Sequence, residues 1–235
     1  MASHGKKRHQ KRLARPRALP ISPKKHVYLK KASAGPHPKD QSLPILTYLV
    51  EIAKLAGNSR EARALLRSDA VLVDGRPVKD AGFPVGFMDI ITIPKASKCV
   101  RVSIFHGRLA FNDAPMEAAG SKLCKIISKR QLGKSRFQLN MHDGRNIMVQ
   151  ESAKYATGGT LRISVPKQEV AEYYPLKAGA RCLVYKGVHS GKVATLSELI
   201  EREASAATDA MLKTGDGSQF ITRKDYLFVV GPEFS

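Results

Sequence analysis

Few side chains in this sequence could carry out covalent chemistry, and none stands in a complete catalytic motif. His142 is followed by Asp143, and such a pair can orient and move a proton. A catalytic dyad also needs a serine, a cysteine or a metal on which to act, and the sequence spacing places none. Because Gly144 comes next, the pair is better explained as part of a β-turn.

The three cysteines also lack the spacing of a reactive or metal-binding set. Cys99, Cys124 and Cys182 are far apart, and no second cysteine or histidine lies at metal-ligand spacing from any of them. This pattern argues against a zinc site and against a disulfide framework. We expect reduced, buried thiols in a cytoplasmic protein, with no metal and no other cofactor.

A glycine-bounded loop ends on a lysine, as nucleotide-binding loops do. Such loops need four residues between the glycines and a Ser or Thr after the lysine, but here three residues separate Gly187 from its partner glycine and Val193 follows the lysine. The flanking sequence predicts a β-hairpin, so we predict no nucleotide site. Two interpretations stay open, a nucleic-acid contact through Lys186, His189 and Lys192 or a plain surface hairpin.

The clearest chemical signal is non-covalent and comes from one predicted helix. Arg60, Arg63 and Arg67 are spaced i, i+3 and i+7, so they share a helix face. The apolar residues around Leu66 lie on the opposite face. Such a row of guanidinium groups suits a phosphate backbone, although a solvated helix face is the alternative.

Two short helices must position this row of arginines. Leu43-Pro44 predicts the start of the first helix, because proline suits the first helical turn, and Gly57 predicts its end. Asn58 is a favourable N-cap for the second helix. Glu61 stands three residues later, where its carboxylate can reach back to the Asn58 N–H.

A hairpin and a returning strand complete this segment. Asp74-Gly75 is a strong signal for a two-residue turn after a strand at Val71 to Val73. The return strand carries two further candidate cations, Arg76 and Lys79. A loop containing Pro84 and Gly86 should then lead into a last strand from Phe87 to Ile93.

The charge of the chain is concentrated at its N-terminus. The 235 residues have a formal net charge of +20, and residues 1–39 hold twelve basic and no acidic residues. Five prolines forbid a long helix there, so the segment should be disordered, or ordered by RNA or DNA. It has no amphipathic face for a membrane surface. The candidate nucleic-acid contacts here are Lys6, Lys7, Arg8, Lys11, Arg12, Arg15, Arg17, Lys24, Lys25, Lys30 and Lys31.

The rest of the chain predicts short strands separated by glycine turns. Residues 99–173 alternate in a way typical of a central β-rich domain, with a hairpin turn at His106-Gly107 and strands at Phe137 to Met141 and Asn146 to Val149. Residues 174–235 predict a small SH3-like barrel of five strands, one of them from Asp209 to Lys213. The predicted fold class is therefore α+β and multi-domain. A basic extended N-terminal tail (1–41) precedes a small helix-pair/β RNA-binding domain (42–98), and the two β domains follow.

Several short stretches, spread over almost the whole chain, occur in an order known from one protein family. They are Gly5-Lys6-Lys7, Gly35-Pro36-His37, Leu43-Pro44, Phe83 to Asp89, Lys122 to Lys125, His142 to Arg145, Gly187 to Val193, and Phe228 to Gly231. Together they resemble the S4e family of small-subunit ribosomal proteins of archaea and eukaryotes.

The resemblance implies an S4-type RNA-binding domain, a central β domain and a C-terminal barrel with a KOW motif in its Lys186 to Lys192 loop. It further implies a non-catalytic, structural constituent of the small ribosomal subunit that binds and positions ribosomal RNA. The implied partners are small-subunit ribosomal RNA and neighbouring ribosomal proteins, in the cytoplasm, without a membrane or a small-molecule substrate. The sequence ends at Ser235, without the basic C-terminal extension of the family's longer members.

Two other classes of protein stay open as alternatives. An RNA-modifying enzyme could use the same small domain to dock its substrate, with a carboxylate such as Asp113, Glu117, Asp143 or Glu151 as its catalytic group. A dissociable KOW-type factor of transcription or translation is the other alternative. A carboxylate in a deep pocket with a perturbed pKa would favour the enzyme.

Overall fold

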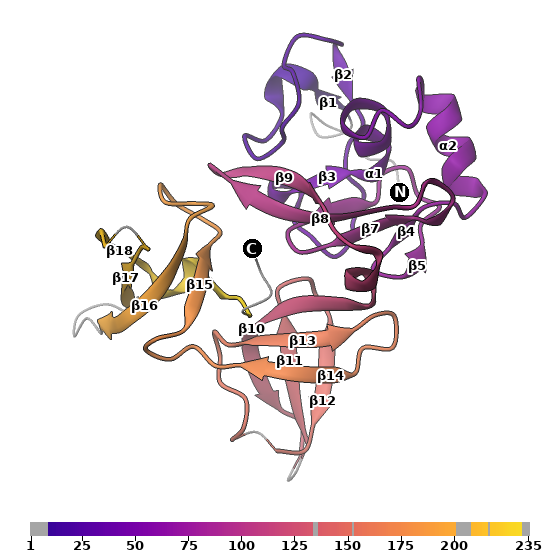
Figure 1. Cartoon of the computed structure of the whole chain (residues 1–235). Helices are drawn as coiled ribbons and strands as arrows, with labels where there is room; N and C mark the ends of the chain where they lie inside the picture. The colour runs from indigo at the N-terminus through magenta and orange to yellow at the C-terminus, as the bar shows by residue number, and fades with distance from the viewer. Residues whose placement is uncertain (1–8, 134–135, 152, 201–207, 216, 232–235) are drawn as a thin grey trace. The chain divides into compact units, whose positions relative to one another are not determined.

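A computed structural model of the chain describes residues 9–133, 136–151, 153–200, 208–215 and 217–231. It divides into two compact units, Met1–Ser103 with Arg108–Gly120, and Ile104–Gly107 with Ser121–Ser235. Within the described ranges, helices are few and short whereas strands are many (Figure 1). The mixed α and β class predicted from the sequence is confirmed. Lys6, Lys7 and Arg8 lie outside the described residues.

The first unit is built around a five-stranded sheet of order β5-β4-β7-β8-β9, with a two-stranded sheet of β3 and β6 and a ribbon of β1 and β2. Its elements are β1 (Gln10–Lys11), η1 (Arg12–Ala14), β2 (Tyr28–Leu29), η2 (Lys39–Gln41), β3 (Ser42–Pro44), α1 (Ile45–Thr47), η3 (Tyr48–Ile52), α2 (Ser59–Arg67), β4 (Leu72–Val73), β5 (Arg76–Pro77), β6 (Pro84–Gly86), β7 (Ile90–Ile93), η4 (Pro94–Ala96), β8 (Lys98–Phe105), β9 (Arg108–Asp113) and η5 (Met116–Gly120).

The two predicted helices are present, with a different end for the first. Pro44 is the N-cap of α1, which continues as the π-helical turn η3 and ends at Ile52 instead of at Gly57. The chain leaves the helix because Lys54 adopts a left-handed conformation with a φ of 51°. The first helix is therefore two turns long, and the residues after it are free to line a surface.

The cap of α2 follows the sequence prediction with a shift of one residue. The Asn58 carboxamide oxygen accepts hydrogen bonds from the N–H groups of Arg60 (2.9 Å) and Glu61 (3.0 Å). The Glu61 carboxylate accepts its hydrogen bond from the Gly57 N–H (2.8 Å), one residue before the predicted donor. The Asn58 and Glu61 side chains thus accept hydrogen bonds from backbone N–H groups at the start of α2. These bonds fix the residue at which the helix, and with it the row of arginines, begins.

The hairpin at Asp74-Gly75 is confirmed, because both residues have positive φ angles, 50° and 72°, as a type I′ turn requires. The Asp74 carboxylate also accepts a hydrogen bond from the Ile90 N–H at 3.0 Å, which ties the turn to β7. The prediction of a loop at Pro84 to Gly86 is wrong. These residues form β6, because they pair with β3, forty residues earlier, and Phe87 to Asp89 turn the chain into β7.

The sheet of the first unit continues past residue 98, the expected end of the RNA-binding domain. Ile90 of β7 pairs with Arg101 of β8, and β9 follows β8 in the strand order. The turn between β8 and β9 at His106-Gly107 has positive φ angles of 47° and 73°, as its sequence predicts. The hairpin of β8 and β9 thus lengthens the main sheet of the first unit.

The N-terminal segment from residue 9 onward packs on the first unit, which corrects the expectation of a segment ordered only by nucleic acid. β1 pairs with β2, and the side chains of Leu19, Ile21 and Leu29 are buried, with 2%, 7% and 7% of their surface exposed. Three apolar residues among many cations are enough to anchor the segment, since each buried side chain contributes about 1.5–3 kcal/mol. Residues 9–41 are the described part of the N-terminal tail.

Two side-chain pairs help to hold the tail in place. The Arg12 guanidinium donates to both carboxylate oxygens of Glu51, with its Nη1 2.8 Å from Oε1, and only 1% of the Arg12 side chain is exposed. Further along, His37 Nε2 lies 2.8 Å from Asp89 Oδ1 in a buried hydrogen bond. A Cβ atom at Gly86 would lie 2.3 Å from the His37 ring, so only glycine allows this approach.

The second unit contains two five-stranded antiparallel sheets, of order β12-β11-β10-β13-β14 and β18-β17-β16-β15-β19. Its elements are β10 (Ser121–Gln131), β11 (Phe137–Met141), β12 (Asn146–Val149), β13 (Thr160–Ser164), β14 (Val170–Tyr174), β15 (Arg181–Val184), β16 (Val193–Ile200), β17 (Asp209–Lys213), β18 (Gln219–Arg223), η6 (Lys224–Tyr226) and β19 (Leu227–Val229).

Each of these sheets has its own apolar cluster. Cys124, Leu139 and Leu161 belong to the first, and Cys182 and Leu212 belong to the second. β11, β12 and β17 coincide with the strands predicted from alternation, whereas β14 was not predicted, because its exposed edge residues mask the alternation. All three cysteines of the chain are free and buried, as predicted.

Replacing Glu51 with Gln should loosen the tail, because the Arg12 guanidinium would stay buried without a charge partner. We expect the free energy of local opening to fall by about 3 kcal/mol. Amide hydrogen exchange measures this at the Arg12 N–H, which donates to the Val27 carbonyl at 3.0 Å. Glu117→Gln on an exposed carboxylate of the same unit is the matched control. Equal exchange in the two variants would contradict a holding role for the pair.

Candidate nucleic-acid interface

The helix α2 presents its arginines as the sequence predicts. Arg60, Arg63 and Arg67 are exposed, whereas Ala62 and Leu66 on the opposite face are completely buried. Burial of Ala62 and Leu66 fixes the rotation of the helix, so the three arginines share one exposed face. The geometry required of a phosphate-binding face is present.

The hairpin of β4 and β5 adds two further cations, one of which already has an ion-pair partner. Arg76 on β5 is exposed. The Lys79 ammonium lies 3.4 Å from the Asp69 carboxylate, with 67% and 48% of the two side chains exposed. A pair so open to solvent contributes about 0–1 kcal/mol. A phosphate could therefore replace Asp69 as the partner of Lys79 at little cost.

A basic cleft of about 890 Å³ opens between the tail and the two helices of the first unit. The cations along its walls are Arg12, Lys25, Lys30, Lys54 and Arg63, and Glu51 is the one carboxylate among the described residues that line it. The hydrogen bond from Arg12 lowers the pKa of Glu51, so this carboxylate is ionised and already balanced by Arg12. The remaining four cations give the cleft a net positive charge.

The cleft brings together residues that the sequence patterns did not connect. Lys25 and Lys30 of the tail meet Arg63 of α2 across it, and Lys54 and His26, which were not predicted as site residues, line it as well. Nothing in the local sequence marks Lys54 apart from its basic charge. Arg12 differs from the expectation, because its buried side chain faces Glu51 instead of solvent.

The other predicted tail cations lie outside this lining. Lys11, Arg17 and Lys24 are exposed, and Arg15 and Lys31 are half-buried. They extend the positive surface without belonging to the cleft. The tail therefore contributes in two ways, as part of the wall of a cleft and as a basic surface beyond it.

The loop between β15 and β16 carries the predicted C-terminal cations on a hairpin, not on a strand-to-helix turn, so a nucleotide-binding loop is excluded. The His189 ring lies 4.3 Å from the Phe220 ring, and the Lys192 ammonium lies 5.9 Å from the same ring. The Lys186 ammonium lies 5.4 Å from the Tyr185 ring. Aromatic rings thus hold all three side chains in place at this loop.

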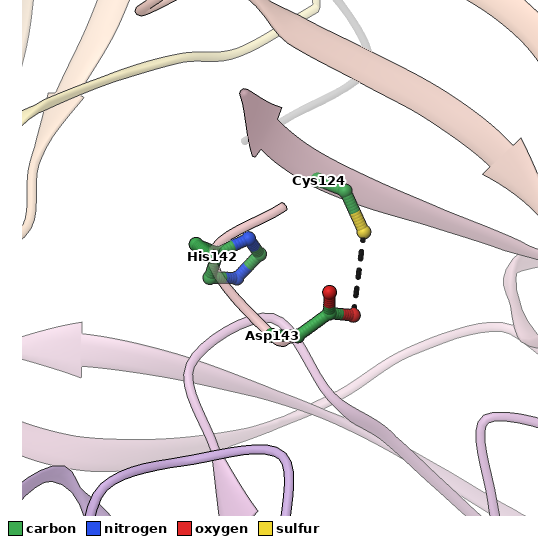
Figure 2. A group of neighbouring side chains, drawn as sticks. All are labelled: Cys124, His142 and Asp143. Carbon is green, nitrogen blue, oxygen red and sulfur yellow. Dashed lines mark hydrogen bonds between the residues drawn. The ribbon is translucent and has the colours of Figure 1, made fainter. Parts of the chain in front are cut away.

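Cys124, His142 and Asp143 come together in the second unit, where their potential ligand atoms all lie within 4.8 Å of one another (Figure 2). The donor set does not fit a metal, because the Asp143 carboxylate lies 3.0 Å from the Lys122 ammonium and Cys124 donates its S–H to the same oxygen at 3.5 Å. The Lys125 N–H donates to His142 Nδ1 at 3.2 Å. The cluster is a buried charge centre that joins β10 to the turn after β11.

The carboxylates considered for an enzyme are unsuited to that role. Asp113, Glu117 and Glu151 are exposed. Burial would raise the pKa of Asp143, but the positive charges of Lys122 and Arg145 outweigh this effect and lower it to about 2. Asp143 is therefore an ionised partner of two cations. Among the described residues, no helix is long and apolar enough to cross a bilayer.

The ionisation of Asp143 should make the stability of the second unit depend on pH. Its folded-state pKa of about 2 lies below the value of about 3.9 of an unfolded chain, so its contribution is complete above pH ~4 and is lost as the pH falls toward 2. We expect about 2 kcal/mol to be lost in urea unfolding over this window. Asp143→Asn should be less stable at neutral pH, and its difference from the unchanged protein should shrink below pH ~4.

Glu198→Gln on the exposed face of β16 is the control for this experiment, because its carboxylate faces solvent. The control should keep the full acid dependence. If Asp143→Asn kept it too, the buried charge centre would not be the acid-sensitive element.

Comparisons with known proteins agree over the whole chain. The family model described as Ribosomal family S4e matches residues 105–170, and that of the S4 domain matches residues 45–91. The chain is 39% identical over 236 residues to the small ribosomal subunit protein eS4 of Methanothermobacter thermautotrophicus, covering 100% of this chain and 97% of the relative. It is 40% identical over 240 residues to the eS4 protein of Methanocaldococcus jannaschii, covering 99% and 98%.

A solved structure shows the same fold. The crystal structure of the 30S ribosomal protein S4e from Thermoplasma acidophilum superposes with a TM-score of 0.70 at 32% sequence identity. The alignment covers 83% of this chain and 97% of the other. Because each unit is about half of the chain, a coverage of 83% means that both units take part in the similarity.

Proposed function

The chain belongs to the ribosomal S4e family, and from this premise we propose that it is a non-enzymatic, structural constituent of the small ribosomal subunit that binds and positions ribosomal RNA. Full-length relatives are named small ribosomal subunit proteins. In this chain, the observation that best supports RNA binding is the basic cleft beside the arginine face of α2. The protein then acts by contact, as part of a cytoplasmic ribonucleoprotein.

The proposed modules follow the chain order. Residues 42–98 form the S4-type RNA-binding domain, supported by the S4 match at 45–91, and β8 and β9 lengthen its sheet. Residues 99–173 include the central β domain, and residues 174–235 form the SH3-like barrel with the KOW loop. Support for the barrel is the five-stranded antiparallel sheet with its separate apolar cluster.

The first unit supplies most of the proposed phosphate contacts. Each Lys or Arg that meets a phosphate releases condensed counterions, so affinity depends strongly on salt. Contacts of this kind position a protein but carry little sequence information, so specificity comes from the shape of the folded RNA. The proposed contacts are Lys11, Arg15, Arg17, Lys24, Lys25, Lys30, Lys31, Arg60, Arg63, Arg67, Arg76 and Lys79, with Arg12 holding the tail that presents them.

The second unit supplies a further proposed contact through Lys186, His189 and Lys192. Because aromatic rings restrain these side chains, less side-chain entropy is lost when they bind a phosphate. Neighbouring ribosomal proteins are the other proposed partners. Each of the two units thus contributes its own set of proposed phosphate contacts.

The function is tested by fractionating a cell lysate on sucrose gradients at low and at high salt and probing for this protein. We expect it to travel with small ribosomal subunits and to stay with them after a high-salt wash. Recovery at the top of the gradient, or release at modest salt, would identify a dissociable factor and overturn the proposal.

Changing Arg60, Arg63 and Arg67 together to Glu should weaken binding to small-subunit ribosomal RNA without unfolding the protein, because all three side chains are exposed. Loss of about three phosphate contacts should lower the slope of log affinity against log salt by roughly 2–3. Titration of the RNA at several salt concentrations measures both quantities.

A matched triple variant separates this face from bulk charge. Lys167, Lys177 and Lys213 are exposed cations of the second unit, and changing them to Glu alters the net charge by the same amount. This control should keep most of the affinity and the salt slope. Equal losses in the two triples would show that net charge, and not the α2 face, governs binding.

A further inference from the structure

One tyrosine in the basic cleft is not explained by phosphate contacts. Tyr28 lines the cleft, yet 61% of its surface is exposed. Its neighbour on β2, Leu29, also lines the cleft but is buried, with only 7% of its surface exposed. A strand alternates the directions of its side chains, so burial of Leu29 places Tyr28 on the open side. An exposed tyrosine is therefore held in a defined position by the strand that anchors the tail.

The ring of Tyr28 is available for stacking. Its neighbour His9, directly before β1, has its ring centroid 5.9 Å away at an interplanar angle of 54°. A tilted contact of this kind restrains the tyrosine without covering a ring face by a parallel stack. The exposed fraction agrees, because a ring covered on both faces could not keep 61% of its surface open.

Several cations line the same cleft as this ring. Lys25 and Lys30 come from the tail on either side of Tyr28 in sequence, and Arg63 comes from α2. The lining also includes the apolar side chains of Leu46 and Val50. The cleft thus combines a flat aromatic surface, an apolar wall and several positive charges, and its volume of about 890 Å³ lies within the usual range for small-molecule sites of about 300–1,000 Å³.

We infer that this cleft takes one unstacked nucleotide of an RNA, with the base against the Tyr28 ring and the adjoining phosphates on Lys25, Lys30 and Arg63. Bases within a duplex have both faces covered by their neighbours, so only a base from a loop, bulge or end can stack on a protein ring. The inference rests on the proposed function and adds the kind of RNA element that the first unit recognises.

The chemistry favours a nucleotide over an acidic peptide. A peptide carboxylate would use the cations but gain little from an exposed aromatic ring. A nucleotide uses both, since every base has a π-face and every phosphate a charge. Glu51, already paired with Arg12, would repel neither ligand strongly. The aromatic ring beside the cations is therefore the feature that selects RNA.

The test measures the affinity of the full-length protein for small-subunit ribosomal RNA purified from the same organism. Tyr28→Ala should raise the Kd by roughly 5- to 150-fold, the range observed for loss of one base–aromatic stack. The salt slope should stay unchanged, because stacking releases no counterions. Tyr28→Phe, which keeps the ring, should bind within about twofold of the unchanged protein.

Two further variants make the result specific. Val27 is 70% exposed beside Tyr28 but does not line the cleft, so Val27→Ala controls for loss of apolar surface in the tail. Lys25→Ala should reduce both the affinity and the salt slope, the slope by about 0.7–0.9 for its single phosphate. Thermal unfolding of each variant should match that of the unchanged protein.

The outcomes separate the inference from the function on which it rests. If the unchanged protein binds ribosomal RNA no better than an unrelated RNA of equal length, the proposed function fails. If it binds specifically and Tyr28→Ala binds equally well, the nucleotide site alone is overturned, and an acidic peptide becomes the occupant to seek. A loss for Tyr28→Phe as large as that for Tyr28→Ala would also overturn stacking.

Discussion

The buried pair of Arg12 and Glu51 is the interaction on which the basic cleft of the first unit depends. The chain has a formal net charge of +20, and its tail is the most basic part, so the tail should be repelled by the basic domain beneath it. It lies there because Glu51 neutralises the innermost cation and because Leu19, Ile21 and Leu29 are buried. Without this anchor the cleft would lose one wall and the Tyr28 ring its position.

Two further buried polar pairs also join separate stretches of the chain. His37 is bound to Asp89 in the first unit, and Lys122 is bound to Asp143 in the second. Since an unpaired buried charge costs several kcal/mol, each carboxylate also selects which segments come together. The outward cations are left for a partner. These three carboxylates are thus paired, whereas the exposed cations leave a positive charge on the surface.

Local signals predicted the elements that depend on near neighbours. The cap at Asn58, the arginine row of α2 and the turns at Asp74 and His106 were all found from residues a few positions apart. Elements that depend on distant partners were missed or mislocated. β6 exists because it pairs with β3, and the first helix ends at Ile52, before the left-handed Lys54, instead of at Gly57. Hydrogen bonds between segments forty residues apart leave no periodicity in either segment.

The sequence by itself determined the family, the mixed fold class, the anionic nature of the partner and the face of α2, because charge, spacing and short stretches of residues are local properties of the chain. Tertiary structure alone decided that Arg12 is buried, that Lys54 and His26 join the cleft, and that Tyr28 stands exposed among cations. It also paired His37 with Asp89 and Lys122 with Asp143, residues whose stretches had identified the family without showing that they touch. The physical reason is that burial and charge pairing are set by neighbours in space, which chain spacing does not encode.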